Sequence, residues 1–288
     1  MGNEEKQYRV VGTRPIRPDG VDKVTGRANF GADIRLNGMI HGRVVRSPHA
    51  HARIKSINTA KALAVPGVKA VITGADFPAI GEGDIAAGEV VVSFYDMARN
   101  VIARDKVLYD GHAVAAVAAL TAEAADEAAA LVEVDYELLP PVITLEDAMK
   151  PDAAVIQDGM ITSGIEPAPT KPSNIAARHE LKLGDAAQGF AEADVVVECE
   201  FRTQTAHQGY IEPHACAATV AADGVATIWC SSQGQFMVRA YTAKLCGMDI
   251  SKVKVIPAEI GGGFGGKTIV YLEPLATMLA KKAGRPVK

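Results

Sequence analysis

The chain has 288 residues, enough for one large or two ordinary domains, and 48% of them are hydrophobic, so we expect a packed core. The formal net charge of −4, without a basic block, excludes a nucleic-acid-binding protein. No apolar run approaches the roughly 18 residues of a membrane helix, and the polar start MGNEEKQYRV has no signal-peptide core. These features predict a cytoplasmic protein with no nucleic-acid or membrane partner.

Strands and short helices alternate in the first half of the chain. Residues 10–34 are expected to be extended, because Pro15 and Pro18 oppose helix formation. Residues 80–92 are Gly-rich and acidic, which is typical of an exposed loop. The other predicted elements are two strands within 39–57, a helix at 59–65, a strand at 68–73, a buried strand at 113–120, a helix at 121–131 and a strand at 132–136.

The last three of these elements form a β–α–β unit that ends at Pro140-Pro141, as expected at the end of a domain. Thr121 fits an N-cap, followed by acidic residues in the first helical turn. Prolines are frequent between residues 146 and 180, which favours a surface linker. We therefore predict a first α/β domain at 1–145, a linker at 146–180 and a second domain at 181–288.

The second domain is predicted to begin with a strand at 194–203, whose later half alternates apolar and polar residues. Ala222-Asp223-Gly224 is a hairpin-turn signal, and Gly247 fits the end of a helix. The remaining predicted elements are strands at 214–220, 225–230 and 252–256 and helices at 236–246 and 269–283.

Cysteines and histidines offer no metal pattern. The four cysteines, none in a CxxC pair, lack iron–sulfur and zinc spacings, so we expect four buried thiols in a reducing cytosol. A metal site at His41, His49 and His51 is disfavoured, because no nearby cysteine or carboxylate completes it.

A Gly-rich stretch, GGGFGGKT at 261–268, lies between a predicted strand and a predicted helix. It matches both the P-loop pattern and the GxGxxG dinucleotide fingerprint, and it could also be a turn without a ligand. A P-loop fold builds most of its sheet after the motif, yet only 20 residues follow Thr268. The acidic residue expected about 20 positions after a dinucleotide fingerprint is absent; Lys281, Lys282 and Arg285 occupy that region.

Five motifs in a fixed order give the chain a specific resemblance. They are DKVTGRANFGADI at 22–34, VLYDGHAVAAVAAL at 107–120, HQGYIEPHACAAT at 207–219, SSQGQFMVRAYTAKLCGM at 231–248 and IGGGFGGK at 260–267. Together they resemble the N-terminal portion of the molybdenum-cofactor large subunit of the xanthine dehydrogenase and aldehyde oxidase family. The resemblance implies an α+β fold, with a small hammerhead-like α/β domain followed by the first part of a molybdopterin-binding domain.

The resemblance also implies roles for particular residues. Gln233 matches the glutamine beside the apical ligand of molybdenum, and Gly262, Gly263, Phe264 and Gly265 match the loop whose backbone N–H groups meet the cofactor.

At the next matching position, Thr268 is a candidate for the substrate pocket. Purine-hydroxylating members carry an acid there, so a purine substrate is disfavoured, whereas aldehydes and aromatic heterocycles remain possible. Glu212 and His207 also match family positions, and we expect structural roles for both.

The implied cofactor is molybdopterin with molybdenum, in the cytosine dinucleotide form. Iron–sulfur and FAD centres are expected on partner chains. The implied partners are an iron–sulfur subunit, a flavin subunit and the second half of the molybdenum subunit, which would carry the base glutamate, so no catalytic residue is expected in this chain. A non-catalytic assembly subunit or relic of the family, and a P-loop nucleotide binder, are the alternative hypotheses.

Overall fold

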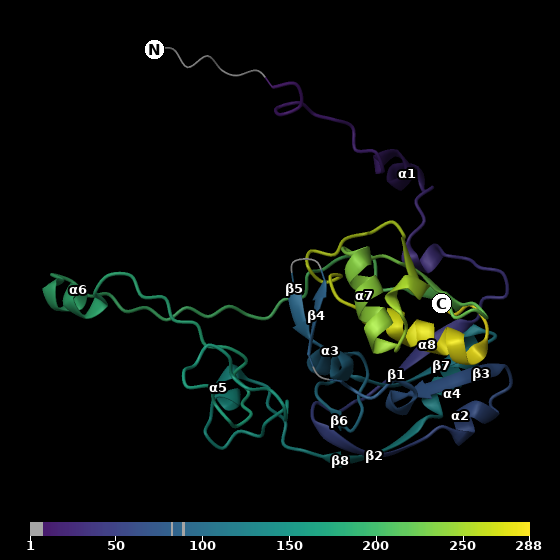
Figure 1. The fold of residues 1–288 in the computed structure, drawn as a ribbon, viewed down its shortest axis with the longest axis horizontal. Coiled ribbons are helices and arrows are strands. Elements are labelled where there is room, and N and C mark those ends of the chain that lie inside the picture. Colours follow the sequence, from purple (N-terminus) through teal and green to yellow (C-terminus); the bar gives the residue numbers. More distant parts are fainter. Residues whose placement is uncertain (1–7, 82, 88–89) are drawn as a thin grey trace.

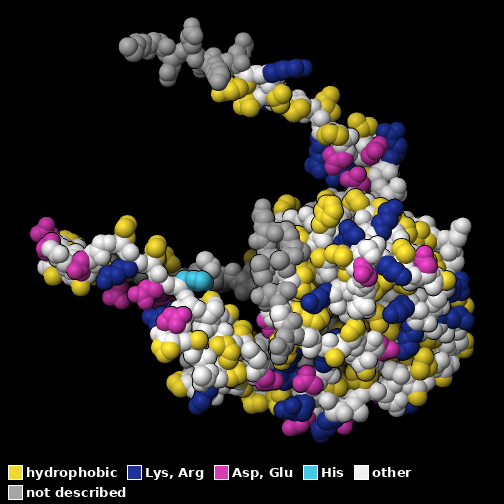
Figure 2. Space-filling view, viewed as in Figure 1, with side chains coloured by type: hydrophobic (Ala, Val, Ile, Leu, Met, Phe, Trp, Pro, Cys, Tyr) yellow, Lys and Arg dark blue, Asp and Glu magenta, His cyan; other side chains and the backbone are white. Residues whose placement is uncertain are grey.

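The computed structural model describes residues 8–81, 83–87 and 90–288. Most of these residues form one body of small sheets and helices (Figure 1). Two segments project from it, the first carrying helix α1 (Gly20–Thr25) and the second carrying helix α6 (Ala186–Glu192). Hydrophobic side chains are visible along the projecting segment that carries α6 (Figure 2).

The first sheet has the antiparallel order β1-β7-β3, formed by β1 (His41–Arg46), β7 (Ala113–Ala119) and β3 (Val68–Thr73). All seven residues of β7 are buried, as its uncharged sequence predicts. Val117 packs in the cluster formed with α2 (Ala60–Ala64) and α4 (Ala122–Ala130). Its neighbours Ala116 and Ala118 belong to the main core, because successive strand residues face opposite ways.

A second antiparallel sheet has the order β6-β2-β8, from β6 (Lys106–Val107), β2 (Ala52–Asn58) and β8 (Glu133–Leu138). The predicted β–α–β unit therefore exists only in chain order. Its two strands, β7 and β8, belong to different sheets and do not pair.

The third sheet, β11-β10-β9, is mixed and contains β9 (Cys216–Val220), β10 (Ala226–Cys230) and β11 (Val253–Pro257). The predicted hairpin turn joins β9 to β10, with Gly224 at φ 82°. Helix α7 (Gln235–Leu245) packs on β11 and ends before Gly247, whose φ of 62° confirms the predicted left-handed terminus.

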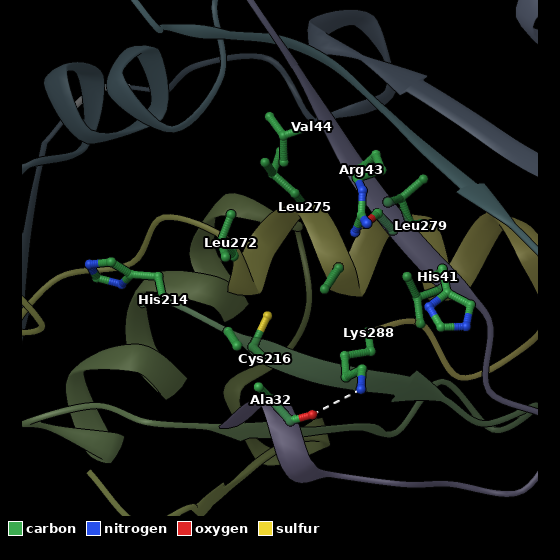
Figure 3. A pocket seen from close by; sticks show the side chains of 14 residues that line it. Ala32, His41, Arg43, Val44, His214, Cys216, Leu272, Leu275, Leu279 and Lys288 are labelled. Carbon is green, nitrogen blue, oxygen red and sulfur yellow. Dashed lines mark hydrogen bonds between the residues drawn. The ribbon is translucent and has the colours of Figure 1, made fainter. Parts of the chain in front are cut away.

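Helix α8 (Glu273–Ala283) lies between the first and third sheets, contacting both β3 and β9. The last residues extend this connection, because Gly42 N donates to Lys288 O at 2.7 Å and Ala218 N donates to Val287 O at 2.8 Å. A cavity of about 260 Å³ remains at this seam, where Leu275 and Leu279 of α8 point toward β1 (Figure 3).

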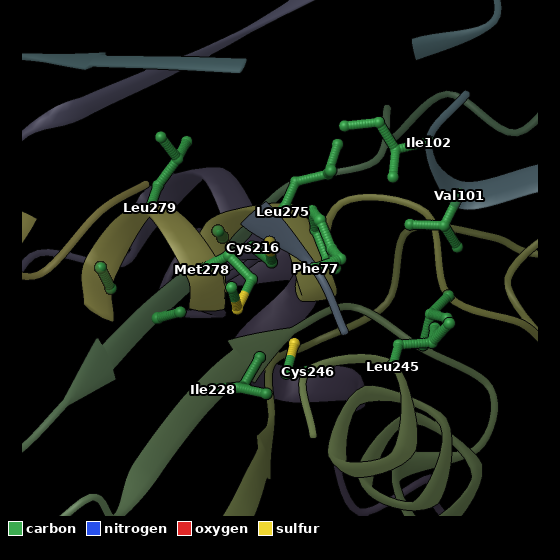
Figure 4. Close-up of a cluster of buried hydrophobic side chains, with 14 of the residues drawn as sticks. Phe77, Val101, Ile102, Cys216, Ile228, Leu245, Cys246, Leu275, Met278 and Leu279 are labelled. Atoms are coloured by element: carbon green, nitrogen blue, oxygen red, sulfur yellow. The ribbon is translucent and has the colours of Figure 1, made fainter. Parts of the chain in front are cut away.

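The main core extends across this seam and contains apolar side chains from both halves of the chain (Figure 4). Phe77 and Ile102 from the first half pack with Ile228, Leu245 and Met278 from the second. The two halves thus share a buried core, beside smaller clusters that belong to the first half alone.

Several features depart from the predicted secondary structure. Residues 194–203 form no strand, because they have no partner strand among the described residues. The last helix begins at Glu273 rather than 269, with a proline in its first turn. Within 80–92, predicted as a loop, β4 (Asp84–Ala87) and β5 (Val90–Ser93) pair instead, whereas residues 82, 88 and 89 lie outside the described residues. The extended N-terminal segment is interrupted by α1.

The remaining elements are short. Helix α3 (Phe94–Val101) was not predicted; its N-cap Ser93 accepts a hydrogen bond from Asp96 N. Thr121 caps α4 as predicted, accepting from Ala124 N at 3.1 Å. The other helices are α5 (Leu145–Ala148), which spans the predicted boundary between the first domain and the linker, and three 3₁₀ turns at Gly31–Asp33, Gly74–Asp76 and Ile250–Lys252. No helix among the described residues is long and apolar enough to cross a membrane.

Candidate functional site

The Gly-rich stretch forms an irregular loop between β11 and α8 that depends on glycine at specific positions. Gly262 and Gly265 have φ values of 102° and 90°, and Phe264, at 47°, is the non-glycine residue with positive φ in the described chain. A Cβ on Gly263 would lie 2.5 Å from Gln233 Oε1. A side chain at 263 would therefore displace the end of the Gln233 side chain.

Gln233 is fixed against this loop by its carbonyl oxygen. Its Oε1 accepts hydrogen bonds from Gly265 N at 3.0 Å and Lys267 N at 3.2 Å, and its backbone N donates to Lys267 O at 2.9 Å. Because the oxygen is used by the loop, the amide Nε2 remains as a donor with no partner among the described residues. The structure thus brings together two pieces that are far apart in the sequence.

Backbone donors of the same loop are also unused. In the described part of the chain, the N–H groups of Gly262, Gly263 and Phe264 have no hydrogen-bond acceptor. Thr268 Oγ1 donates to Gly265 O at 2.9 Å, which places Thr268 against the loop but engages its hydroxyl. Together with Gln233 Nε2, these N–H groups give the site the chemistry of an anion or oxo-ligand receptor.

Lys267 faces the protein interior. Its side chain is 1% exposed, and its Nζ lies 2.7 Å from Glu212 Oε2. Glu212 Oε2 also accepts from Gly261 N at 2.7 Å, and Glu212 Oε1 accepts from Ser231 Oγ at 2.5 Å. The carboxylate therefore fixes both ends of the glycine run, which is the structural role expected for Glu212.

This arrangement disfavours phosphate binding by the loop. A P-loop lysine must reach the phosphates, and its helix begins at the motif. Here Lys267 is buried in an ion pair, and α8 begins five residues after Thr268.

Electrostatics in the site follow from this ion pair. Burial opposes the ionisation of Glu212, but Lys267, Ser231 and the N–H of Gly261 outweigh it and hold the pKa of Glu212 below its usual range. Burial, reinforced by the charge of Lys267, lowers the pKa of His214. Neutral His214 and ionised Glu212 are therefore expected near pH 7.

The N-terminal segment also supports the loop, a connection that the sequence analysis missed. Gly31 N donates to Ser231 Oγ at 3.0 Å, and a Cβ on Gly31 would lie 2.5 Å from Ala215 O. Lys23 Nζ lies 3.2 Å from Glu259 Oε2 and 3.3 Å from Ile260 O. The signal available was the glycine within ANFGADI, since a glycine outside a turn often marks a close approach.

The histidines of the first half make other contacts. His49 packs edge-on against Tyr136, and His51 Nδ1 lies 2.8 Å from Pro140 O. In the second half, His207 Nδ1 accepts from Gly209 N at 3.0 Å, a local turn contact. Within the described residues, no three His, Cys, Asp or Glu side chains are grouped for metal binding.

The expectation of four buried thiols was wrong for one cysteine. Cys216, Cys230 and Cys246 are buried and free, and burial raises the pKa of Cys246 to about 12. Cys199 is exposed, because the segment predicted as a strand projects from the body.

Comparisons with known proteins agree with this geometry. Residues 25–140 match the family model described as the aldehyde oxidase and xanthine dehydrogenase a/b hammerhead domain, and residues 168–288 match the molybdopterin cofactor-binding domain.

Individual proteins are similar over almost the whole chain. The carbon monoxide dehydrogenase large chain of Afipia carboxidovorans is 36% identical, over 96% of this chain and 34% of the relative. The nicotinate dehydrogenase large molybdopterin subunit of Eubacterium barkeri is 32% identical, over 98% of this chain and 61% of the relative. The crystal structure of quinoline 2-oxidoreductase from Pseudomonas putida 86 superposes with a TM-score of 0.79 at 29% identity, over 96% and 34%.

The hammerhead-domain match is followed along the chain by the molybdopterin-domain match, and the chain superposes on a solved molybdenum hydroxylase. These matches define the class of protein. The chain belongs to the xanthine dehydrogenase and aldehyde oxidase family and corresponds to the N-terminal region of its molybdenum-cofactor large subunits. It spans about a third of the length of the A. carboxidovorans relative.

Proposed function

We propose that this chain is part of a cytoplasmic molybdenum hydroxylase that oxidises an aldehyde or heteroaromatic carbon with water-derived oxygen, and that it needs a further segment or chain for activity. The observation that carries the proposal is a set of unused donors, the N–H groups of Gly262, Gly263 and Phe264 in the Gly-rich loop and Nε2 of Gln233, which is bonded to that loop. Three buried free thiols suit a reducing compartment. We also propose the domain boundaries 1–145, 146–180 and 181–288.

The residues present fit the molybdopterin group. Oriented backbone donors stabilise oxo ligands and phosphate-like anions, and glycine allows their close approach. Space is open in front of Gly265, where an added Cβ would meet no atom within 4 Å. Glu212, the carboxylate bonded to the loop, is neutralised by Lys267 and does not repel an anionic cofactor.

In this proposal molybdopterin, in its cytosine dinucleotide form, would supply the redox chemistry, and iron–sulfur and flavin centres would be held by partner chains. The role of this chain would be to hold and orient the cofactor. Gln233 would donate from Nε2 to a ligand of the metal, and Gly262, Gly263 and Phe264 would donate backbone N–H groups. The N–H of Gly265 instead holds Gln233 Oε1. Thr268 would border the substrate. The general base would come from the remainder of the subunit, since Glu212 is already ion-paired.

An exposed segment supports the need for more protein. In residues 194–203, Val195, Val197 and Phe201 are 77%, 78% and 89% exposed. These residues alternate with the polar Glu198, Glu200 and Arg202, so one face of an extended chain would be apolar. Such a segment is typical of a strand awaiting a sheet, and we propose that the remainder of the molybdenum subunit supplies that sheet.

The test is to isolate the native complex through a tag on this chain and measure molybdenum per chain. We expect stoichiometric molybdenum in wild type and a loss of at least half in Gln233→Ala, with Gln188→Ala on exposed α6 as the matched control. A folded, complete complex without molybdenum would contradict the proposal and favour a non-catalytic assembly subunit.

A further inference from the structure

A second cavity, of about 380 Å³, lies between the first sheet and the Gly-rich loop. The β1–β7 sheet and α3 supply one side, including Arg46 and Val101, and the loop and the start of α8 supply the other, including Gly266 and Tyr271. It adjoins the seam cavity, since both are lined by His214, Leu272 and Leu275. Gly266 directly follows the cofactor residue Gly265, and Tyr271 lies three residues after Thr268, whereas Arg46 and Val101 come from the first half of the chain.

One wall of this cavity is aromatic and continuous. The ring centroids of His207 and Tyr210 lie 4.8 Å apart, those of Tyr210 and His214 lie 5.6 Å apart, and those of His214 and Tyr271 lie 5.0 Å apart. A 2.9 Å hydrogen bond between Tyr210 Oη and His214 Nε2 fixes the middle of the wall. Neighbouring rings are inclined by 57°, 83° and 69° in the same order, so the wall is faceted, and a planar ligand can stack on the face of one of its rings.

The wall is held against the cofactor loop. A Cβ on Gly266 would lie 2.7 Å from Tyr210 Cε1, so the loop backbone and the Tyr210 ring are in close contact. Lys267 Nζ also lies over the Tyr210 ring, 4.9 Å from its centroid. A cation over an aromatic ring stabilises its position, which makes the wall a rigid surface.

The charge of the cavity has one sign. Arg46 is the formally charged residue among those lining it, and no lining residue in the described chain is an aspartate or glutamate. Arg46 Nη1 donates to Gly111 O at 2.9 Å, whereas Nε and Nη2 have no acceptor among the described residues. The guanidinium is therefore anchored at one nitrogen and keeps donors for a ligand anion.

The neighbouring groups respond to this charge. Burial raises the pKa of Tyr109, and the positive charge of Arg46 opposes that rise. Arg46 also contributes, after burial and Lys267, to the lowered pKa of His214. An anion in the cavity would meet the Arg46 cation and the neutral imidazole of His214, with Val101, Leu272 and Leu275 as an apolar floor.

We propose that this cavity is a binding site for a planar aromatic monocarboxylate, whose carboxylate is held by Arg46 and whose ring packs on the wall from His207 to Tyr271. The apolar floor favours an organic ring over an inorganic anion of the same charge. The site goes beyond the proposed cofactor chemistry, since none of its contacts requires molybdenum.

Calorimetric titration of the native complex tests the site, with benzoate, neutral benzamide and inorganic phosphate as probes. We expect saturable benzoate binding and, for benzamide and phosphate, affinities lower by about tenfold or more, because the charge-assisted bond or the stacked ring is lost. Arg46→Leu should lower the affinity for benzoate about tenfold. Arg43 lies on the same strand and pairs with the exposed Asp126. Arg43→Leu should change the affinity for benzoate by less than about twofold.

Tyr271→Leu is the second variant, because Tyr271 is 41% exposed and its loss spares the core. Tyr271→Leu should also lower the affinity for benzoate, whereas Tyr271→Phe, which keeps the ring, should not. Absence of saturable benzoate binding, equal affinity for benzamide, or unchanged affinity in both Arg46→Leu and Tyr271→Leu would overturn the inference. A molybdenum-free complex that still binds benzoate would instead contradict the proposed function alone.

Discussion

Lys267 and Glu212 form an ion pair with a 2.7 Å separation between Nζ and Oε2, in which the side chains are only 1% and 9% exposed. The two residues are 55 positions apart and join the Gly-rich loop to the segment before β9. This pair explains why a lysine that completes a phosphate-binding pattern does not bind phosphate here. Its charge is already used inside the fold.

Replacing Lys267 by methionine should destabilise the protein by about 3–5 kcal/mol, because a buried carboxylate would lose its countercharge. Urea unfolding of the purified complex measures this loss. Lys281→Met on the exposed face of α8 is the control and should change stability by less than about 0.5 kcal/mol. Equal stability of the two variants would show that the ion pair is not formed. Nucleotide affinity lost specifically in Lys267→Met would revive the P-loop hypothesis.

The same pair predicts a dependence on pH. Because the pKa of folded Glu212 lies below its usual value, its contribution to stability is complete above about pH 4.3 and is lost as the pH falls through the folded pKa. The stability difference between wild type and Glu212→Gln should therefore be largest near neutral pH and should shrink below about pH 4. Urea unfolding at a series of pH values measures it, with exposed Glu198→Gln as the control. A difference that grows on acidification would contradict the assignment.

Gly263→Ala should separate cofactor binding from folding. The added Cβ would lie 2.5 Å from Oε1 and 2.7 Å from Cδ of Gln233, so the side-chain amide must move and its bonds to Gly265 and Lys267 are lost. We expect at least a threefold loss of molybdenum per chain with an unchanged circular dichroism spectrum, since the end of an exposed glutamine moves at little energetic cost. Gly189→Ala, with open space around its added Cβ, is the matched control. Full molybdenum content in Gly263→Ala would show that the position of the Gln233 side chain does not matter for cofactor binding.

Val197→Asp tests the exposed segment. Val197 is 78% exposed, so the body should keep its melting temperature, whereas association with the remainder of the subunit should fall because a charge would enter a strand interface. Co-purification through a tag on this chain provides the readout. Glu198→Gln, on the opposite face of the extended segment, should leave recovery unchanged. Normal recovery with Val197→Asp would show that this face stays in solvent.

Several features follow from the sequence because their causes are local. The run at 113–119 has no charge on either face, and its length and composition favour a strand buried on both sides, as observed. Thr121 and Gly247 mark helix ends through the bonding of their own neighbours. Five short motifs in order were enough to indicate the family, which the hammerhead and molybdopterin domain matches confirm.

Only the tertiary structure decided which groups are used and which remain free. The direction of Lys267 depends on a carboxylate 55 residues away, and the extended but unpaired state of 194–203, with its exposed Cys199, depends on a partner strand that local sequence does not report. The juxtaposition of Arg46 with Tyr271 likewise requires the packing of α8 against the first sheet. The physical reason is common to all three, since ion pairs, strand pairing and cavities are relations between distant segments.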